Sequence, residues 1–207
     1  MKMDERMMKR INFVKITSSL QLLGLILLLA PKLTSAQQKI EREYAIKATQ
    51  VPEPALEFVN QTFYKKRIKW YAEESQKGRS IEAKVKQDGT VYSIEFDEKG
   101  NLQDIETLIS FNSLPQDLQK AIMKTLEADF TRIKIHKMQR QWTGNAATLQ
   151  QLASKKKPEK EYTTRYEIVI RGSKDRSTSD YEVLVDDHGK LISKSKIIQK
   201  DSPHLLF

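Results

Sequence analysis

The fold is decided by a pattern that occurs twice, as YSIEFDEKGNL at residues 92–102 and as YEVLVDDHGKL at residues 181–191. Each copy alternates like a strand, reaches an Asp, places a Gly three residues later and then starts a new strand. Asp97 and Asp186 can accept hydrogen bonds from their own turn backbone, and Gly100 and Gly189 supply the positive-φ position. The pattern predicts two β-hairpins. Because each copy is preceded by matching material, it also indicates a duplicated unit.

Residues 1–36 have the pattern of a secretory signal peptide. A basic start is followed by an apolar run over residues 22–30, and Thr34 and Ala36 fit the −3 and −1 positions of a cleavage site. We therefore predict cleavage after Ala36, with the mature protein in the periplasm or secreted. The alternative is an uncleaved anchor, but its apolar core falls short of the ~20 residues that span a bilayer, so we expect no stable membrane span. The sequence has no Cys to accept a lipid, which excludes a lipoprotein.

Composition excludes several functional classes. The 171 residues after Ala36 suffice for one ordinary domain or two small lobes, and they carry 30 Lys and Arg against 25 Asp and Glu. This mild, dispersed positive excess argues against nucleic acid as a partner. The absence of Cys rules out disulfides and thiol catalysis, and three scattered His give a zinc site little to use. We expect no cofactor and no metal.

The predicted organisation starts with a loosely held lead-in at residues 37–50, with a short helix around 40–47. A first unit at residues 51–112 follows. Pro54 suits a first helical turn, and Leu56, Val59 and Phe63 follow at helical spacing, which predicts a helix over residues 54–64. Four strands come next, because apolar and polar residues then alternate between turns.

A second unit is predicted at residues 113–199, with an inserted loop at 141–160 and a tail at 200–207. Leu118, Ile122, Leu126 and Phe130 recur every four residues, which predicts a longer helix. The expected fold class is α+β, with two tandem helix-plus-four-strand repeats that form a largely antiparallel sheet with both helices on one face.

These segments resemble a known family. The stretches KWY at 69–71, IEAK at 81–84, YSIEFD at 92–97, GNLQDIE at 100–106, YEIVI at 166–170 and VDDHG at 185–189 are similar to the PepSY-like, β-lactamase-inhibitor-like family of exported bacterial proteins. The resemblance covers residues 51–199. It implies a tandem αβ₄ fold whose open sheet face binds other proteins, and relatives that inhibit a β-lactamase or restrain secreted peptidases. It implies no set of catalytic residues, and the inhibitory loops of the inhibitor branch have no match here.

Candidate catalytic and metal-binding groups have simpler interpretations. Glu73 and Glu74 are adjacent on a strand and point to opposite faces, so they cannot flank one glycosidic bond. Asp97, Asp186 and Asp187 lack the alternating ligand series of a calcium loop, and turn capping explains them. His136 has no nucleophile or acid at a motif spacing. The Lys155-Lys156-Lys157 run, with Lys160, is interpreted as a solvated loop, although it could attract an acidic partner or an anionic membrane surface.

The sheet face opposite the helices is the remaining candidate site. Strand parity, together with proximity to the inserted loop, selects seven residues for a protein-binding face: Lys69, Tyr71, Lys84, Glu95, Trp142, Arg165 and Glu167. The same parity would serve an ordinary solvated sheet. Trp70 and Tyr166 are expected in the core.

The sequence therefore predicts a non-enzymatic binding or inhibitory module of the cell envelope, with an exported protein such as a peptidase or another enzyme as partner. The alternatives are a small-ligand carrier or structural envelope protein and, as the weakest hypothesis, an unrecognised hydrolase.

Overall fold

The computed structural model describes residues 37–39, 41–75 and 78–198. The predicted signal peptide, its cleavage site after Ala36 and the tail at 200–207 lie outside these ranges. Among the described residues, no helix combines the length and the apolar character that crossing a membrane requires.

Within the described ranges, ten strands form one sheet in the order β1-β10-β9-β8-β7-β6-β5-β4-β3-β2. Neighbouring strands from β10 to β2 are antiparallel, and β1 pairs with β10 in parallel. The strands are β1 (Gln37–Lys39), β2 (Glu41–Ile46), β3 (Ile68–Ser75), β4 (Gly78–Gln87), β5 (Thr90–Asp97), β6 (Leu102–Leu108), β7 (Arg132–Gly144), β8 (Tyr162–Lys174), β9 (Ser177–Asp186) and β10 (Leu191–Ile197).

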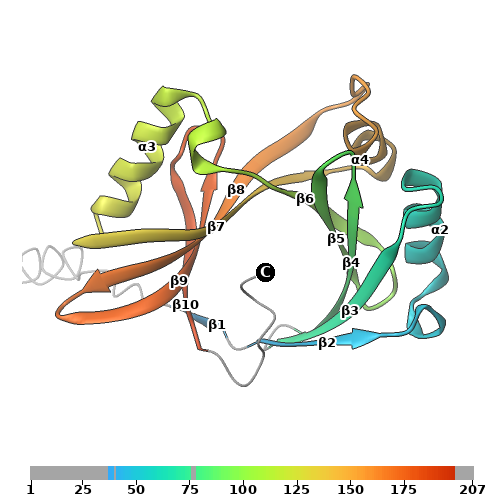
Figure 1. Ribbon diagram of the computed structural model, residues 1–207, viewed down its shortest axis with the longest axis horizontal. Coiled ribbons are helices and arrows are strands. Elements are labelled where there is room, and N and C mark those ends of the chain that lie inside the picture. The colour runs from blue at the N-terminus through green and yellow to red at the C-terminus, as the bar shows by residue number, and fades with distance from the viewer. Residues whose placement is uncertain (1–36, 40, 76–77, 199–207) are drawn as a thin grey trace, which may run out of the picture. The chain divides into compact units, whose positions relative to one another are not determined.

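The described chain has three α-helices, which lie on the outer side of the curved sheet (Figure 1). They are α2 (Glu53–Thr62), α3 (Gln116–Glu127) and α4 (Ala146–Ala153), accompanied by the 3₁₀ turns η1 (Ala48–Gln50) and η2 (Phe111–Ser113). Helix α2 has a proline in its first turn, where the missing N–H costs no hydrogen bond. Asn145 caps the N-terminus of helix α4, and its side chain accepts a hydrogen bond from the Thr148 backbone N–H.

The expected fold class, two tandem helix-plus-four-strand repeats, is wrong. The structure is a single sheet, because β6 pairs with β7 along Ile105–Leu108 and Gln139–Trp142, so no boundary separates two units. The predicted inserted loop instead contains the end of β7 and a third helix, α4. Two further strands, β1 and β2, extend the sheet. Sequence periodicity showed the alternation within strands, but it could not show which strands pair.

The N-terminal segment, residues 37–46, pairs with the strands at both ends of the sheet, although we expected a loose lead-in at residues 37–50. Strand β2 pairs with β3 from Ile46↔Trp70 to Glu41↔Ser75, and β1 pairs with β10 at the opposite edge. One residue separates β1 from β2 in the sequence. A stretch of ten residues thus protects two edges that would otherwise expose unpaired backbone groups.

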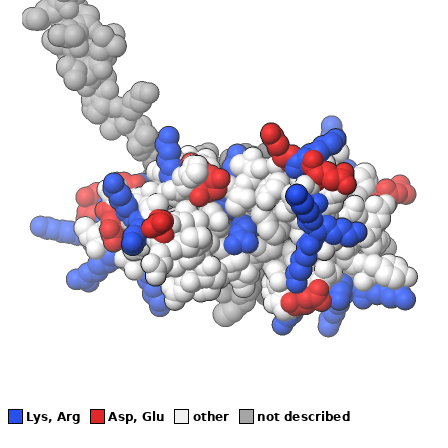
Figure 2. Space-filling view, turned by 90° about the horizontal axis from the view of Figure 1, so that it is seen from above, with Lys and Arg blue, Asp and Glu red and all other residues white. Residues whose placement is uncertain are grey.

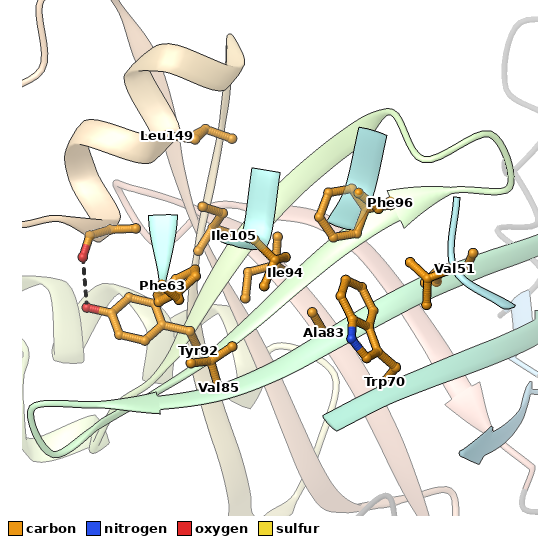
Figure 3. Close-up of a cluster of buried hydrophobic side chains, with 14 residues drawn as sticks. Val51, Phe63, Trp70, Ala83, Val85, Tyr92, Ile94, Phe96, Ile105 and Leu149 are labelled. Atoms are coloured by element: carbon orange, nitrogen blue, oxygen red, sulfur yellow. Dashed lines mark hydrogen bonds between the residues drawn. The ribbon is translucent and has the colours of Figure 1, made fainter. Parts of the chain in front are cut away.

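The first hydrophobic core joins α2 and α4 to strands β3–β6 (Figure 3). Phe63, after α2, packs against Tyr92 with ring centroids 5.2 Å apart, and Trp70 lies 6.3 Å from Phe96. Helix α4 adds Leu149, which is fully buried, and the Ala153 carbonyl accepts a 3.4 Å hydrogen bond from the Tyr92 hydroxyl. The segment that we expected to be a loop therefore completes this core.

The second hydrophobic core lies beneath α3. It contains Ile122 and Leu126 from the predicted helical stripe, Phe130 after the helix, and inward-facing residues of β7, β8 and β9. The Phe130 and Tyr181 ring centroids are 4.7 Å apart. Gly172 lies directly under this ring: a Cβ there would come within 2.6 Å of Phe130 Cδ1. The glycine thus creates the space that the ring fills.

The two repeated turns dock against helices. Asp97 accepts hydrogen bonds from Lys99 N and Asn101 N at 2.8 Å, and Asp186 accepts equivalent bonds from His188 and Lys190. Gly100 and Gly189 have φ of +85° and +77°. A Cβ on Gly100 would lie 2.9 Å from Pro52 Cβ and 3.2 Å from Ala55 N, and one on Gly189 would lie 2.9 Å from Ile122 N. The glycines are therefore required both for the turn and for the approach of α2 and α3.

Candidate functional site

The polar face is the side of the sheet that faces away from the helices. Directly paired residues share a face, so the register identifies its members. One row runs Tyr71–Glu82–Glu95–Asp104, and a second runs Lys69–Lys84–Ser93–Glu106–Gln141–Arg165. Glu43 joins the polar face from β2, and Gln139 and Glu167 join it from β7 and β8.

Lys84 organises one end of the polar face. Its Nζ lies 3.0 Å from Glu43 Oε1 and 3.0 Å from Glu82 Oε2, and 4.6 Å from the centroid of the Tyr71 ring. Burial alone would lower the pKa of Lys84, but the charges and hydrogen bonds of Glu82 and Glu43 outweigh it and raise the pKa. The lysine is therefore held in its charged form against an aromatic ring.

Three carboxylates meet at the centre of the polar face. Glu95 lies on β5 and Asp104 is its partner on β6, while Glu106 follows two residues later on the same face. One oxygen from each of the three lies within 4.8 Å of the others. Asp104 and Glu106 are only 8% and 3% exposed, and Glu95 is partly exposed. We call these three residues the acidic cluster.

The acidic cluster is costly to ionise. Burial raises the pKa of Asp104 to about 7, helped by the Glu82 carboxylate and opposed by Arg165. Burial likewise raises the pKa of Glu95 and Glu106 well above the ordinary glutamate value. Asp104 adds to both shifts, and Glu167 is the largest charge acting on Glu106. Near neutral pH, these shifts favour a bound proton on the acidic cluster.

Two glutamines of β7 provide hydrogen bonds to the acidic cluster. Gln139 Nε2 donates to Glu106 Oε2 at 2.6 Å, and Gln141 Nε2 lies 3.3 Å from both Asp104 Oδ2 and Glu106 Oε1. Asp104 Oδ1 is buried and accepts no hydrogen bond from any described residue. The hydrogen bonds from Gln139 and Gln141 connect β7 to β6. The acidic cluster therefore lies where these two strands join the part of the sheet covered by α2 and α4 to the part covered by α3.

The structure brings six of the seven predicted binding residues onto the polar face: Lys69, Tyr71, Lys84, Glu95, Arg165 and Glu167. Trp142 lies on the other face, opposite Ile105, and packs against the first hydrophobic core. Trp70 and Tyr166 are 8% and 7% exposed and belong to the two cores, as parity predicted.

Sequence reasoning missed Asp104, Glu106, Gln139 and Gln141. A signal for the acids was present, because Asp104 and Glu106 flank the buried Ile105 in alternation and must share the opposite face. Their closeness to Glu95 depends on the register across the Asp97 turn, where the pairing shifts between Glu95 and Phe96 because Gln103 is an extra residue in β6. Periodicity carries no information about that shift.

The other candidate groups lie apart from the acidic cluster. Glu73 pairs with Glu43 on the polar face, whereas Glu74 accepts a hydrogen bond from Tyr44 on the other face. His136 is exposed at an irregularity of β7. The lysine run follows α4, with Lys155 Nζ 4.0 Å from Asp88. Figure 2 shows basic and acidic side chains interspersed over the surface in view, with no patch of one sign.

Comparisons with known proteins yield structural neighbours of low similarity. No family model and no curated protein matches the chain. A DUF2874 family protein from Bacteroides ovatus is 15% identical, with a TM-score of 0.45 over 70% of this chain and 87% of that one. A BLIP-like protein from Bacteroides fragilis is 16% identical, with a TM-score of 0.47 over 75% and 93%. A Bacteroides eggerthii protein described as periplasmic is 11% identical, with a TM-score of 0.47 over 70% and 88%.

One of these neighbours is described as BLIP-like, a class that the sequence resemblance also names, and no family model shows the PepSY-like part of that resemblance. Identities of 11–16% and TM-scores below 0.5 are too low to transfer an activity or a partner to this chain. Its function is therefore inferred below from the polar face itself.

Proposed function

We propose that this protein is an exported, non-enzymatic binding module whose polar face contacts another exported protein, such as a peptidase or another enzyme of the envelope. The observation that carries the proposal is the Tyr71–Lys84 pair beside a charged row on one sheet face. Aromatic and cationic side chains held in place by neighbours are typical of residues that dominate binding energy. The leader pattern of residues 1–36 supports export.

The geometry leaves part of the polar face accessible. Lys69 is exposed, and Tyr71, Lys84 and Arg165 are partly exposed, so a partner can reach them. Because they lie on paired strands, little conformational freedom is lost when a partner binds.

Site-specific photo-crosslinking in the producing cell tests this proposal. A p-benzoylphenylalanine at position 71 places the crosslinker on the polar face, and one at Tyr64, which is 72% exposed beyond α2, is the matched control. We expect a single protein adduct from position 71 that is absent at position 64 and is weakened at least about tenfold by Lys69→Glu. The same adducts from both positions, or no adduct from position 71, would refute the proposal.

A second candidate function, a small-ligand carrier, is favoured by the burial of polar side chains on the same face. Glu106, Gln139 and Ser93 are 3%, 4% and 5% exposed, which is unusual for a face meant only for solvent. A thermal-shift screen distinguishes the two candidates, because a specific small ligand raises the melting temperature by mass action without any protein partner.

A further inference from the structure

The acidic cluster contains more carboxylate oxygens than the described chain provides donors for. Gln139 and Gln141 make three hydrogen bonds to it, two of them at 3.3 Å. Both donors are neutral amides. Arg165 lowers the pKa of Asp104, and Lys137 lowers the pKa of Glu106. Burial and the neighbouring acids outweigh both effects, so the two pKa values remain raised. When its carboxyls are ionised, the cluster therefore holds more negative charge than its neighbours offset, in a poorly hydrated place.

Asp104 Oδ1 is the second observation. Asp104 is 8% exposed, and this buried oxygen accepts no hydrogen bond from any residue in the described ranges. A buried carboxylate oxygen without a donor costs free energy unless another group satisfies it. The side chain lies among the carboxylates of Glu95 and Glu106, so a ligand bound there would complete all three residues at once.

The donor set specifies the chemistry of that ligand. Three carboxylates form an all-oxygen donor set, which suits hard divalent cations and not the soft metals that sulfur ligands select. Oxygens on opposite sides of a bound Ca²⁺ stand about 4.6–5.2 Å apart, compared with about 4.2 Å for Mg²⁺. The three cluster oxygens lie within 4.8 Å of one another, a distance that the coordination shell of Ca²⁺ can span.

We propose that Glu95, Asp104 and Glu106 bind a divalent cation of the Ca²⁺ class at the centre of the polar face. Asp104 Oδ1 and one oxygen from each glutamate contact the ion, and Gln139 and Gln141 hold the carboxylates from β7. The cation would neutralise most of the cluster's charge and fix β5 to β6 on this face. This site is separate from the Tyr71–Lys84 contact and does not depend on a protein partner.

Calorimetric titration of Ca²⁺ into EDTA-treated, dialysed protein, purified after expression of the full chain, tests the site. We expect one ion per chain with a Kd of about 10⁻⁴ M, in the range of extracellular calcium modules, and a higher melting temperature in about 5 mM Ca²⁺. Asp104→Asn and Glu106→Gln should each weaken binding at least about tenfold. Asp117→Asn, on a fully exposed side chain of α3, should leave it unchanged.

Loss of binding in the cluster variants is not explained by unfolding, because neutralising a buried acid removes repulsion; circular dichroism of each variant checks this. The proposal is overturned if wild-type protein takes up no Ca²⁺ at about 1 mM, or if Asp104→Asn binds it equally well. It is also overturned if only lowering the pH, and never Ca²⁺, raises the melting temperature. In that case the carboxylates share protons.

Discussion

Lys84 and Glu43 meet across the polar face, with Lys84 Nζ donating to Glu43 Oε1 at 3.0 Å although β3 lies between their strands. Glu43 belongs to β2, the strand that covers one edge of the sheet, and its side chain is 6% exposed. The bond therefore ties the N-terminal segment to the interior of the sheet.

Replacing Lys84 with Met should destabilise the protein by about 2 kcal/mol, because it removes the cation that lies 3.0 Å from both the buried Glu43 and the neighbouring Glu82. The raised pKa of Lys84 means that its stabilising contribution is complete below the unfolded-state pKa of 10.5. It is lost as the pH rises through the folded-state pKa.

Urea unfolding measures the effect of Lys84→Met. Lys120→Met is the control, since Lys120 pairs with Asp117 at 3.9 Å on an exposed helix face and should change stability by less than about 0.5 kcal/mol. Equal losses in the two variants would contradict the role assigned to Lys84.

Gly189→Ala should cost about 2 kcal/mol, because Gly189 has φ of +77° and an added Cβ would lie 2.9 Å from the Ile122 backbone nitrogen in α3. Gly144→Ala is the matched control, since its nearest contact is 3.3 Å away on Tyr162 and its φ is ordinary. Thermal unfolding that ranks the control as the more damaging change would show that the turn does not dock on α3 as described.

Asp97→Ala should lower the melting temperature at neutral pH, because it removes the acceptor for Lys99 N, Asn101 N and Asn101 Nδ2. Those hydrogen bonds from Asn101 and Lys99 hold the pKa of Asp97 below 3.8. Its contribution is therefore present above pH 3.8 and is lost as the pH falls through the lower folded-state pKa. Melting curves of wild type and variant should converge in strong acid, and a constant difference would argue against the ionised cap.

In the presence of EDTA, Asp104→Asn should have the opposite effect on stability from Asp97→Ala. The pKa of Asp104 is raised to about 7, so the folded state binds a proton more tightly than the unfolded state between pH 3.8 and about 7. Stability falls across that window as the pH rises, by up to about 1.4 kcal/mol per pH unit. The variant removes this cost and should be more stable than wild type near pH 8. The effect is moderated by the other charged residues that act on the acidic cluster, which are Glu82, Glu95, Glu106, Glu167, Arg165 and Lys137.

Melting temperatures of wild type and Asp104→Asn near pH 8 and near pH 5 provide the comparison. A variant that is less stable than wild type near pH 8 would mean that the Asp104 carboxylate is already compensated in the cation-free protein.

Local structure was predictable from the sequence. The stripe of Ile122, Leu126 and Phe130 indicated a helix and its buried side, and alternation placed Trp70 and Tyr166 in the cores. The two Asp-x-x-Gly turns were predicted with the correct capping role. These features depend on neighbours within a few residues, which is the range that periodicity reports.

Long-range pairing was not predictable. The fold class was wrong because the β6–β7 pairing depends on residues about 35 positions apart, and because β1 and β2 come from a segment without strong alternation. Trp142 was assigned to the polar face from its nearness to the predicted insertion, but β7 continues to Gly144 and turns it to the core. The acidic cluster depends on the register shift opposite Glu95, where β6 has the extra residue Gln103, and on the amides of β7, neither of which the sequence identifies.

The middle of the polar face is a buried acidic site. Carbon-13 NMR titration of the Asp104 side-chain carboxyl in EDTA, assigned by its loss in Asp104→Asn, tests it most directly. The structure predicts a midpoint near pH 7, coupled to the titrations of Glu95 and Glu106. A midpoint at the ordinary aspartate value of about 3.9 would mean that water reaches the acidic cluster freely, and it would contradict this account.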